Sequence, residues 1–200
     1  MKKLSFSAIA LLALFSFQAC NDRATDAVDS ANETNEVKQD SAEHMGNNAA
    51  ASAVMPVDED DSKFAVKAAS AGMTQVQLGE LAQQKAVSQK VKDFGAMMVK
   101  DHTQANDELK SLAGMKNITL PPAPGEDHMK HITDLSKESG KDFDKDYMKM
   151  MVSDHKDVID AFEKTSNDGK DADIKAFATK MLPALKSHHD AAKMIYDGLK

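Results

Sequence analysis

The chain has 200 residues, of which 28% are charged and 42% hydrophobic, and its formal net charge at pH 7 is −7. Residues 1–20 contribute +2 to this charge and residues 21–61 contribute −9, so residues 62–200 are neutral overall. A folded part without charge bias is not expected to bind nucleic acid or an anionic bilayer. The single cysteine excludes an intramolecular disulfide.

Residues 1–20, MKKLSFSAIALLALFSFQAC, have the pattern of a signal peptide, in which two lysines precede an apolar run too short to span a membrane. Cys20 ends this run after a small residue, which resembles the lipobox of bacterial lipoproteins. We therefore predict an exported cell-envelope lipoprotein that is lipidated at Cys20 and either faces the periplasm or lies at the outer membrane. Phe17 and Gln18 differ from the usual lipobox residues, so cleavage by the ordinary signal peptidase is the alternative.

The segment 21–61 has eleven acidic and two basic residues and almost no large apolar side chain. Such a composition buries too little surface to offset the entropy of folding. We predict a disordered acidic tether between the membrane and a folded domain at 62–200, which is long enough for one core. The partner predicted for the chain is thus a membrane, through the N-terminal lipid, and the sequence identifies no protein partner.

Apolar residues in the folded part recur at helical spacing, and no strand pattern is present. The spacing predicts an all-α four-helix bundle with one extra short helix between the second and third long helices. Ser62 and Ser88 are expected to cap the first two long helices, Gly140 to close the short one, and Pro183 to kink the last. The predicted helices span 62–85, 88–114, 126–139, 141–165 and 171 to near the C-terminus.

Each long helix carries one polar residue on its apolar face: Gln75, His102, His155 and His188. Two of the histidines end closely similar pentapeptides, MVKDH at 98–102 and MVSDH at 151–155. If the long helices alternate in direction along the chain, the four residues lie within about one turn of each other, counted from one end. Counted from the other end, His188 is about six residues out of step.

Two interpretations of the three histidines are open: neutral core residues bonded to nearby carbonyls or carboxylates, or ligands of one metal ion. Each buried polar group left unpaired costs about 1–3 kcal/mol, so three at one height favour a shared ligand. Asp101 and Asp154 are further candidate ligands, or hydrogen-bond partners of ligands, although a solvated acidic face explains them too. Gln75, Met98 and Met151 are interpreted as polar and packing residues beside the site.

Four segments resemble the exported bacterial family called domain of unknown function 4142, whose members are labelled outer membrane proteins. The segments are FAVKAASAGMTQVQLGELAQQKA, VKDFGAMMVKDHTQANDELKSLA, FDKDYMKMMVSDHKDVIDAFEK and DIKAFATKMLPALKSHHDAAK. The resemblance covers nearly all of 62–194 and implies a ferritin-like fold and an envelope location. It implies no activity, and kinship at the level of the fold cannot supply one.

Two differences, one from the family and one from the di-iron carboxylate pattern, bear on the kind of metal. This chain has Gln75 and Gln77 where members of the family have glutamates. The di-iron carboxylate pattern needs a glutamate three residues before a ligating histidine, whereas Val99, Val152 and Leu185 occupy those positions here. A mononuclear, histidine-rich site suits zinc, copper or nickel better than a di-iron centre.

The leading hypothesis is a membrane-tethered binding module with a transition metal in its core. A copper form of it adds Met98, Met151, Met181 and His189 as ligands. The first alternative is a ferritin-like oxidoreductase that handles iron or peroxide. The second is a metal-free structural or stress protein whose polar cluster sets the register of the helices.

Overall fold

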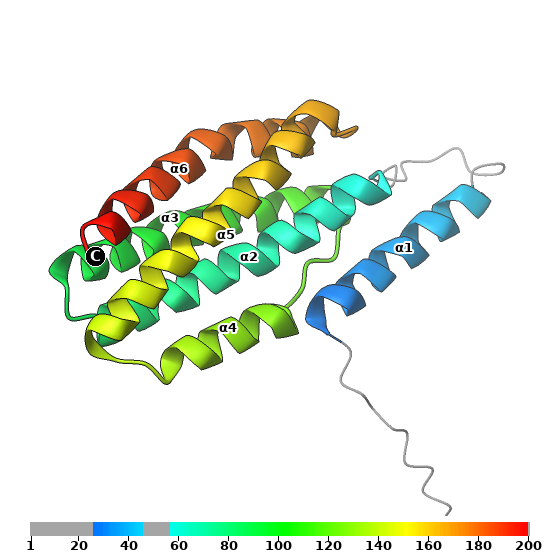
Figure 1. Cartoon of the computed structure of the whole chain (residues 1–200). Helices are drawn as coiled ribbons and strands as arrows, with labels where there is room; N and C mark the ends of the chain where they lie inside the picture. Colours follow the sequence, from blue (N-terminus) through cyan, green and yellow to red (C-terminus); the bar gives the residue numbers. More distant parts are fainter. Residues whose placement is uncertain (1–25, 46–56, 200) are drawn as a thin grey trace, which may run out of the picture.

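The computed structural model describes residues 26–45 and 57–199, and over these ranges the chain forms six helices and no strand. The helices are α1 (Ala27–Met45), α2 (Glu59–Lys85), α3 (Gln89–Met115), α4 (Glu126–Ser136), α5 (Gly140–Asp168) and α6 (Ala172–Asp197) (Figure 1). The predicted all-α class is confirmed for this part of the chain. The predicted signal peptide and Cys20 lie outside it.

The long helices α2, α3, α5 and α6 form a bundle in which α2 and α6 each pack on both α3 and α5 (Figure 1). Two buried aspartates join the hairpins α2–α3 and α5–α6 at their ends. Asp61, at the start of α2, accepts hydrogen bonds from the Lys170 and Asp171 amides in the α5–α6 turn (2.8 and 2.6 Å). Asp144, at the start of α5, accepts hydrogen bonds from the Val87 and Ser88 amides in the α2–α3 turn (3.0 and 2.8 Å).

These bonds define the direction of each long helix. The start of α2 and the α5–α6 turn share one end of the bundle, and the start of α5 and the α2–α3 turn share the other. Hence α5 runs parallel to α3, and the long helices do not alternate in direction along the chain. The reason is the crossover at 116–139, which contains α4 and carries the chain back along the bundle before α5 begins.

Several helix ends differ from the predicted ones. Helix α2 begins earlier because the Asp58 carboxylate caps it by accepting from the Asp60 amide (3.0 Å), and Ser62 lies inside the first turn. Ser88 occupies the N-cap position of α3 as predicted, but its side chain makes no capping hydrogen bond. Gly140, with a φ of 68°, opens α5 rather than closing α4, which already ends at Ser136. Glycine suits this position because a positive φ is costly for residues with a Cβ.

The apolar core is divided into two clusters along the bundle. One includes Phe64, Leu109, Leu112, Phe162, Ile174, Phe177 and Leu185. The other includes Leu78, Phe94, Met98, Phe143, Tyr147, Met148, Met151 and Ala192. On each long helix the polar residue of the apolar face lies between a member of one cluster and a member of the other, as His102 does between Met98 and Leu109.

Helix α1 lies within the segment predicted to be a disordered tether, so that prediction is wrong for residues 27–45. The helix is capped by Asp26, whose Oδ1 accepts from the Val28 amide (2.7 Å). It docks mainly through polar contacts. The buried Asn35 donates to the Thr119 carbonyl (3.0 Å) and accepts from the Thr119 amide (2.7 Å), while Ala31 is the small apolar residue beside it. A contact face of this kind has no apolar stripe for sequence analysis to detect.

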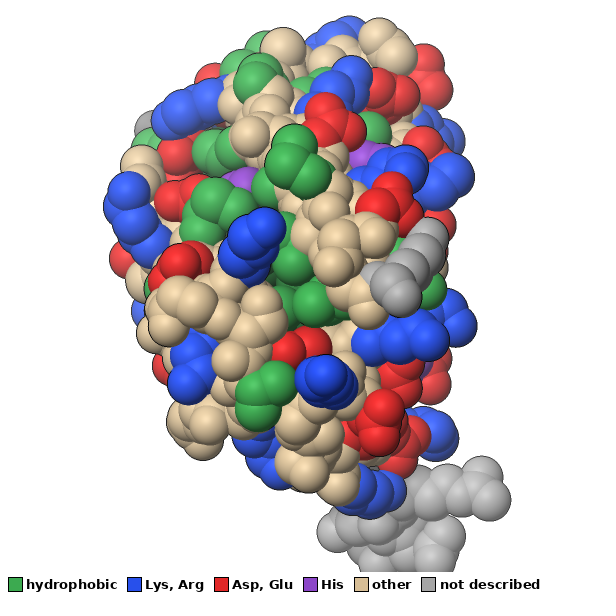
Figure 2. All heavy atoms as spheres, turned by 60° about the vertical axis from the view of Figure 1, so that its left-hand side comes forward, with side chains coloured by type: hydrophobic (Ala, Val, Ile, Leu, Met, Phe, Trp, Pro, Cys, Tyr) green, Lys and Arg blue, Asp and Glu red, His purple; other side chains and the backbone are tan. Residues whose placement is uncertain are grey.

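The outer surface of the bundle mixes both signs of charge. Lysine and acidic side chains are interspersed on the face in Figure 2, and several form ion pairs, such as Lys180 with Glu108 and Lys186 with Glu163. Within the described ranges, no helix combines the length and the apolar character needed to cross a membrane.

Candidate metal centre

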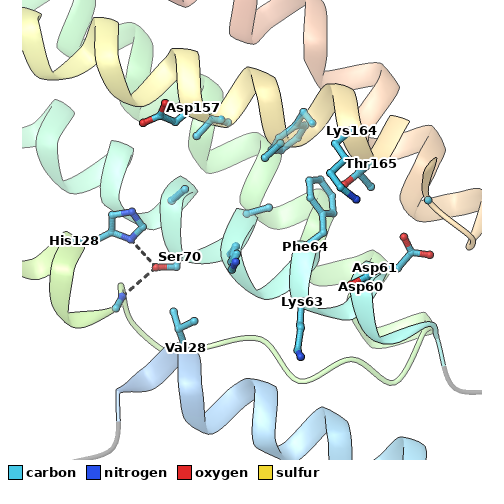
Figure 3. A pocket seen from close by; sticks show the side chains of 18 of the residues that line it. Val28, Asp60, Asp61, Lys63, Phe64, Ser70, His128, Asp157, Lys164 and Thr165 are labelled. Atoms are coloured by element: carbon cyan, nitrogen blue, oxygen red, sulfur yellow. Dashed lines mark hydrogen bonds between the residues drawn. The ribbon is translucent and has the colours of Figure 1, made fainter. Parts of the chain in front are cut away.

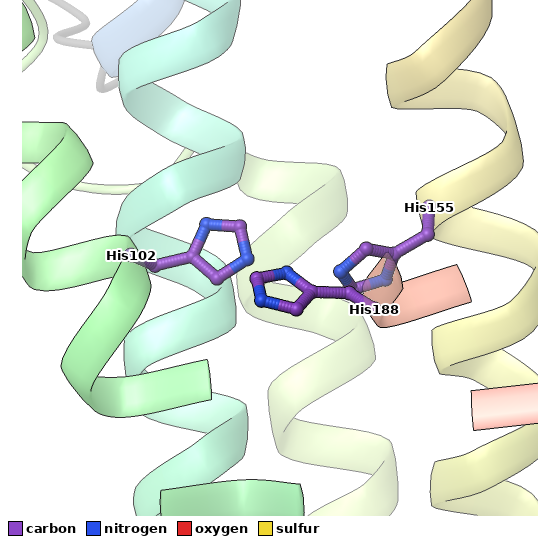
Figure 4. A group of neighbouring side chains, drawn as sticks. All are labelled: His102, His155 and His188. Carbon is purple, nitrogen blue, oxygen red and sulfur yellow. The ribbon is translucent and has the colours of Figure 1, made fainter. Parts of the chain in front are cut away.

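Three histidine side chains meet in the middle of the bundle, one each from α3, α5 and α6 (Figure 4). They are His102, His155 and His188, and their relative exposures are 8%, 2% and 4%. Their ring centroids are 5.5–5.8 Å apart. One ring nitrogen from each lies within 4.8 Å of the others, and this is the only such group of His, Cys, Asp or Glu found among the described residues.

The observed helix directions explain why the three residues are level. At the end of the bundle that holds the α5–α6 turn, α2 and α6 start and α3 and α5 finish. Counted from that end, His102 and His155 are 13 residues along their helices, and Gln75 and His188 are 16. A difference of three residues is less than one helical turn. The crossover thereby removes the offset of His188 that alternating helices would have produced.

Hydrogen bonds to the ring nitrogens identify the donor atom of two histidines. His155 Nδ1–H donates to the Met151 carbonyl (2.9 Å), so the lone pair of this imidazole lies on Nε2. His188 Nε2–H donates to Asp101 Oδ2 (3.0 Å), which leaves the lone pair on Nδ1. These two nitrogens and His102 Nε2 are buried and have no hydrogen-bond partner among the described residues.

Burial keeps two of these rings, His102 and His155, neutral. It lowers the pKa of His102 to about 3, with a further contribution from the neighbouring His155 and His188. Burial also lowers the pKa of His155 to about 4, although its hydrogen bond to the Met151 carbonyl acts in the opposite direction. Both imidazoles are therefore unprotonated at pH 7, the state in which imidazole binds metals.

The remaining long helix, α2, contributes the amide of Gln75 to the same layer. Gln75 is 3% exposed, and its Oε1 has no hydrogen-bond partner in the described part of the chain. Its Nε2 makes a long contact with Asp154 Oδ2 (3.5 Å). Burial raises the pKa of Asp154 to about 6, more than the opposing effects of His131 and of the Gln75 amide lower it.

The remaining predicted site residues fall into two groups. Asp101 and Asp154 lie beside the histidine group but are not part of it: Asp101 orients His188, and Asp154 contacts Gln75. Met98 and Met151 are fully buried in the core cluster one turn away, as the packing interpretation predicts. His189 lies outside the group, and its Nδ1 is 3.4 Å from Asp190 Oδ1.

The histidine group fits a transition metal with a small adjustment. Ligand nitrogens about 2.0–2.1 Å from a tetrahedral zinc ion are roughly 3.4 Å apart. Since the three nitrogens lie within 4.8 Å of one another, each would move inward by less than about 1 Å. Metal-ligating histidines usually donate their second ring N–H to a carbonyl or carboxylate. His155 and His188 already do so.

Two residues beside this centre, Gly72 and Asn106, carry no motif or stripe position that marks them in the sequence. A Cβ at position 72 would lie 2.0 Å from Asn106 Oδ1, so the glycine makes room for that amide. A glycine in the middle of a long helix lowers the stability of the helix by about 1 kcal/mol relative to alanine. Its presence at position 72 is the sequence signal from which a close contact there could have been predicted.

A cavity of about 870 Å³ lies among α1, α2, α4 and α5, away from the histidine group (Figure 3). On its wall Ser70 Oγ is 2.8 Å from His128 Nδ1 and accepts from the Gly125 amide (3.0 Å). Ser70 is 1% exposed. These bonds join the start of α4 to α2, and we assign this serine–histidine pair a structural role rather than a nucleophilic one.

Comparison with known proteins gives one match. The family described as "Domain of unknown function (DUF4142)" matches residues 46–195, which include α2 to α5, most of α6 and all three histidines. No curated protein and no solved structure matches the chain.

Proposed function

The chain belongs to the DUF4142 family, and we propose that it is a cell-envelope binding module that holds one transition-metal ion through His102, His155 and His188. The observation that carries this proposal is the convergence of three buried ring nitrogens that lack any hydrogen-bond partner among the described residues. A bound ion gives all three lone pairs a partner at once.

The energetics favour an ion over a purely structural cluster. Each unpaired buried polar group costs about 1–3 kcal/mol, and a polar cluster that only sets helix register would bond its members to each other. Here the hydrogen bonds run outward, to Asp101 and to the Met151 carbonyl, and the free nitrogens point inward. Outward bonds with inward lone pairs are the arrangement of a metal site.

The donor set bears on the kind of metal. Three neutral imidazoles without a thiolate suit zinc, copper or nickel. No glutamate stands three residues before any of the three histidines, which disfavours a di-iron carboxylate centre. An iron- or peroxide-handling oxidoreductase is the second candidate. Two antiparallel hairpins joined by one long crossover support it, since ferritin-like folds share this arrangement.

Metal content tests the proposal. Protein purified from its own envelope fraction without chelators is expected to contain about one metal ion per chain by elemental analysis. A variant with alanine at His102, His155 and His188 is expected to contain none. The control changes His131 and His189, which lie outside the group, to alanine. Equal metal content in all three proteins, with helical content unchanged by circular dichroism, would exclude the site.

The oxidoreductase candidate has a separate test. Oxygen uptake after addition of ferrous iron to the loaded protein should be stoichiometric if the chain oxidises iron. It should stay at the level of the triple alanine variant if the chain only binds a metal.

A further inference from the structure

A small cavity lies against the histidine group and is distinct from the large cavity near Ser70. Its volume is about 60 Å³, and His102, His155 and His188 all line it. A space of this size has room for roughly four water molecules. It is therefore large enough for a ligand of two or three heavy atoms but too small for an organic substrate.

The cavity lies on one side of the histidine group only. Its lining residues come from the turns toward the Phe64 and Phe162 cluster: Ala68 and Ala71 on α2, Ala105 and Leu109 on α3, Val158 and Phe162 on α5, and Ala184 and Leu185 on α6. The residues one turn away on the opposite side are Leu78, Met98, Met151 and Ala192, which are all 0% exposed and do not line it. An ion held by the three histidines is thus closed on one side by packed core and faces an open space on the other.

We propose that this ion keeps one coordination position open toward the cavity and binds a small anion there. The inference rests on the proposed metal site. Three histidine ligands and one exchangeable position are the pattern of catalytic rather than structural zinc sites. A divalent ion with three neutral ligands retains its charge, and the mostly apolar walls strengthen its attraction for an anion.

Two amides also line the cavity. Gln75 contributes an Oε1 that is buried and lacks a partner among the described residues, so an O–H on the ligand would satisfy it. Asn106 fits into the wall because position 72 is glycine. The site therefore suits an anion of up to three heavy atoms, and one that carries a hydrogen, such as hydroxide, would pair with Gln75 as well.

One opening of the cavity lies between α3 and α6. Ala184 is exposed and lines the cavity, and the Asp101 side chain, which also lines it, is 35% exposed. The Asp101 carboxylate already accepts from His188. A small anion can thus reach the ion beside Ala184 without unfolding of the bundle.

The test uses the full chain loaded with Co(II), whose visible absorption reports its coordination, and azide as the probe. Azide is expected to shift the cobalt spectrum with a saturable dependence on concentration. Ala105→Leu should fill the cavity, since a leucine on a helix points toward the preceding turn, and Ala184→Leu should block the entrance. Both are expected to weaken azide binding at least tenfold and leave the Co(II) affinity unchanged. Ala96→Leu, at an exposed position of α3, is the matched control.

The outcomes separate the two proposals. If the wild-type chain binds no Co(II), the metal site itself is wrong. If Co(II) binds but azide leaves its spectrum unchanged, as when Gln75 occupies the fourth position, the open position is refuted while the metal site stands. Azide affinities that are equal in wild type, Ala184→Leu and the control would also overturn the inference, because binding would not depend on the cavity. Ala184→Leu keeps the test decisive if the half-buried Ala105→Leu variant does not fold.

Discussion

His102 has a buried Nε2 without a hydrogen-bond partner among the described residues, which is a cost to the metal-free protein. Replacing it with leucine, which has a similar volume and no polar atom, should remove that cost. We expect His102→Leu to leave the free energy of unfolding of the metal-free protein unchanged or to raise it by about 1–2 kcal/mol. If His102 only stabilised the metal-free fold, His102→Leu would lower the free energy of unfolding by about 1–2 kcal/mol. That result would contradict the metal interpretation.

The same variant should lose the response to metal. A ligand present at 100 times its dissociation constant stabilises the folded state by about 2.7 kcal/mol. In urea denaturation with Zn(II), wild type and a His131→Leu control should gain stability of this order. His102→Leu should gain little stability from Zn(II), because it has lost one of the three ligands.

The lowered pKa values of His102 and His155, about 3 and 4, predict how stability depends on pH. Below an unfolded-state pKa of about 6.5, the unfolded chain takes up protons that the folded chain does not, so stability falls with falling pH. The contribution of each histidine is fully present above about pH 6.5, and roughly 2 kcal/mol of it is lost by pH 5.

Asp154 should act in the opposite direction. Its pKa is raised to about 6, so between about pH 4 and 6 the folded chain binds the extra proton, and stability rises as the pH falls. Urea denaturation of metal-free wild type and of the His102→Leu, His155→Leu double variant at pH 7 and pH 5 separates the two effects. The double variant should lose less stability at pH 5. Equal losses would mean that the two histidines are not held neutral by the fold.

At the scale of the element, helix α1 is attached mainly through polar contacts, of which those of Asn35 are the most buried. Asn35 makes two hydrogen bonds to the backbone of Thr119, and it is 4% exposed. Asn35→Ala leaves the amide and the carbonyl of the half-buried Thr119 without these partners, which costs up to about 1–3 kcal/mol. Because α1 has little apolar contact of its own, we expect this change to release α1 and leave the bundle folded.

Hydrogen exchange measures this release directly. Amides of α1 should lose their protection in Asn35→Ala, whereas amides of α2, α3, α5 and α6 should keep theirs. Thr34→Ala is the control, since Thr34 is exposed and bonds only to the Ser30 carbonyl of its own helix. Full protection of α1 in both variants would show that other contacts hold it.

At the scale of the whole molecule, docking of α1 changes how an N-terminal lipid would hold the domain. Five residues lie between Cys20 and Asp26, and at most about 3.6 Å per residue limits the span of these six steps to roughly 20 Å. We therefore expect lipidation of Cys20 to keep the bundle near the membrane rather than at the end of a long tether.

Cys20→Ser tests the attachment. The variant is expected to leave the membrane fraction with its helical content unchanged, because Cys20 precedes all six described helices. Intact-mass analysis of the wild type should find a mature N-terminus that carries several acyl groups, since stable anchoring needs more than one chain. A soluble wild-type protein with an unmodified N-terminus would mean that the ordinary signal peptidase processed it.

The sequence alone determined the helical segments of the folded part at 62–200 and which residues interrupt their apolar faces, but not helix α1. Helical periodicity is a local property, so the four long helices and the polar residue on each can be found from spacing alone. The three histidines were identified as a group on this basis, and the structure brings their rings together. Local patterns also placed the breaks at 116–125 and around Gly169 close to their observed positions.

Tertiary structure alone decided the direction of α5, the docking of α1 and the atoms that the site presents. The direction depends on the path of the crossover and on the Asp61 and Asp144 bonds, which join residues more than fifty positions apart. Asn35 docks α1 onto a backbone 84 residues away, and no periodicity encodes such a contact. Which nitrogen of His188 is free depends on Asp101 of another helix. Such contacts arise only when distant segments pack, because each is a property of a pair of helices and not of either one.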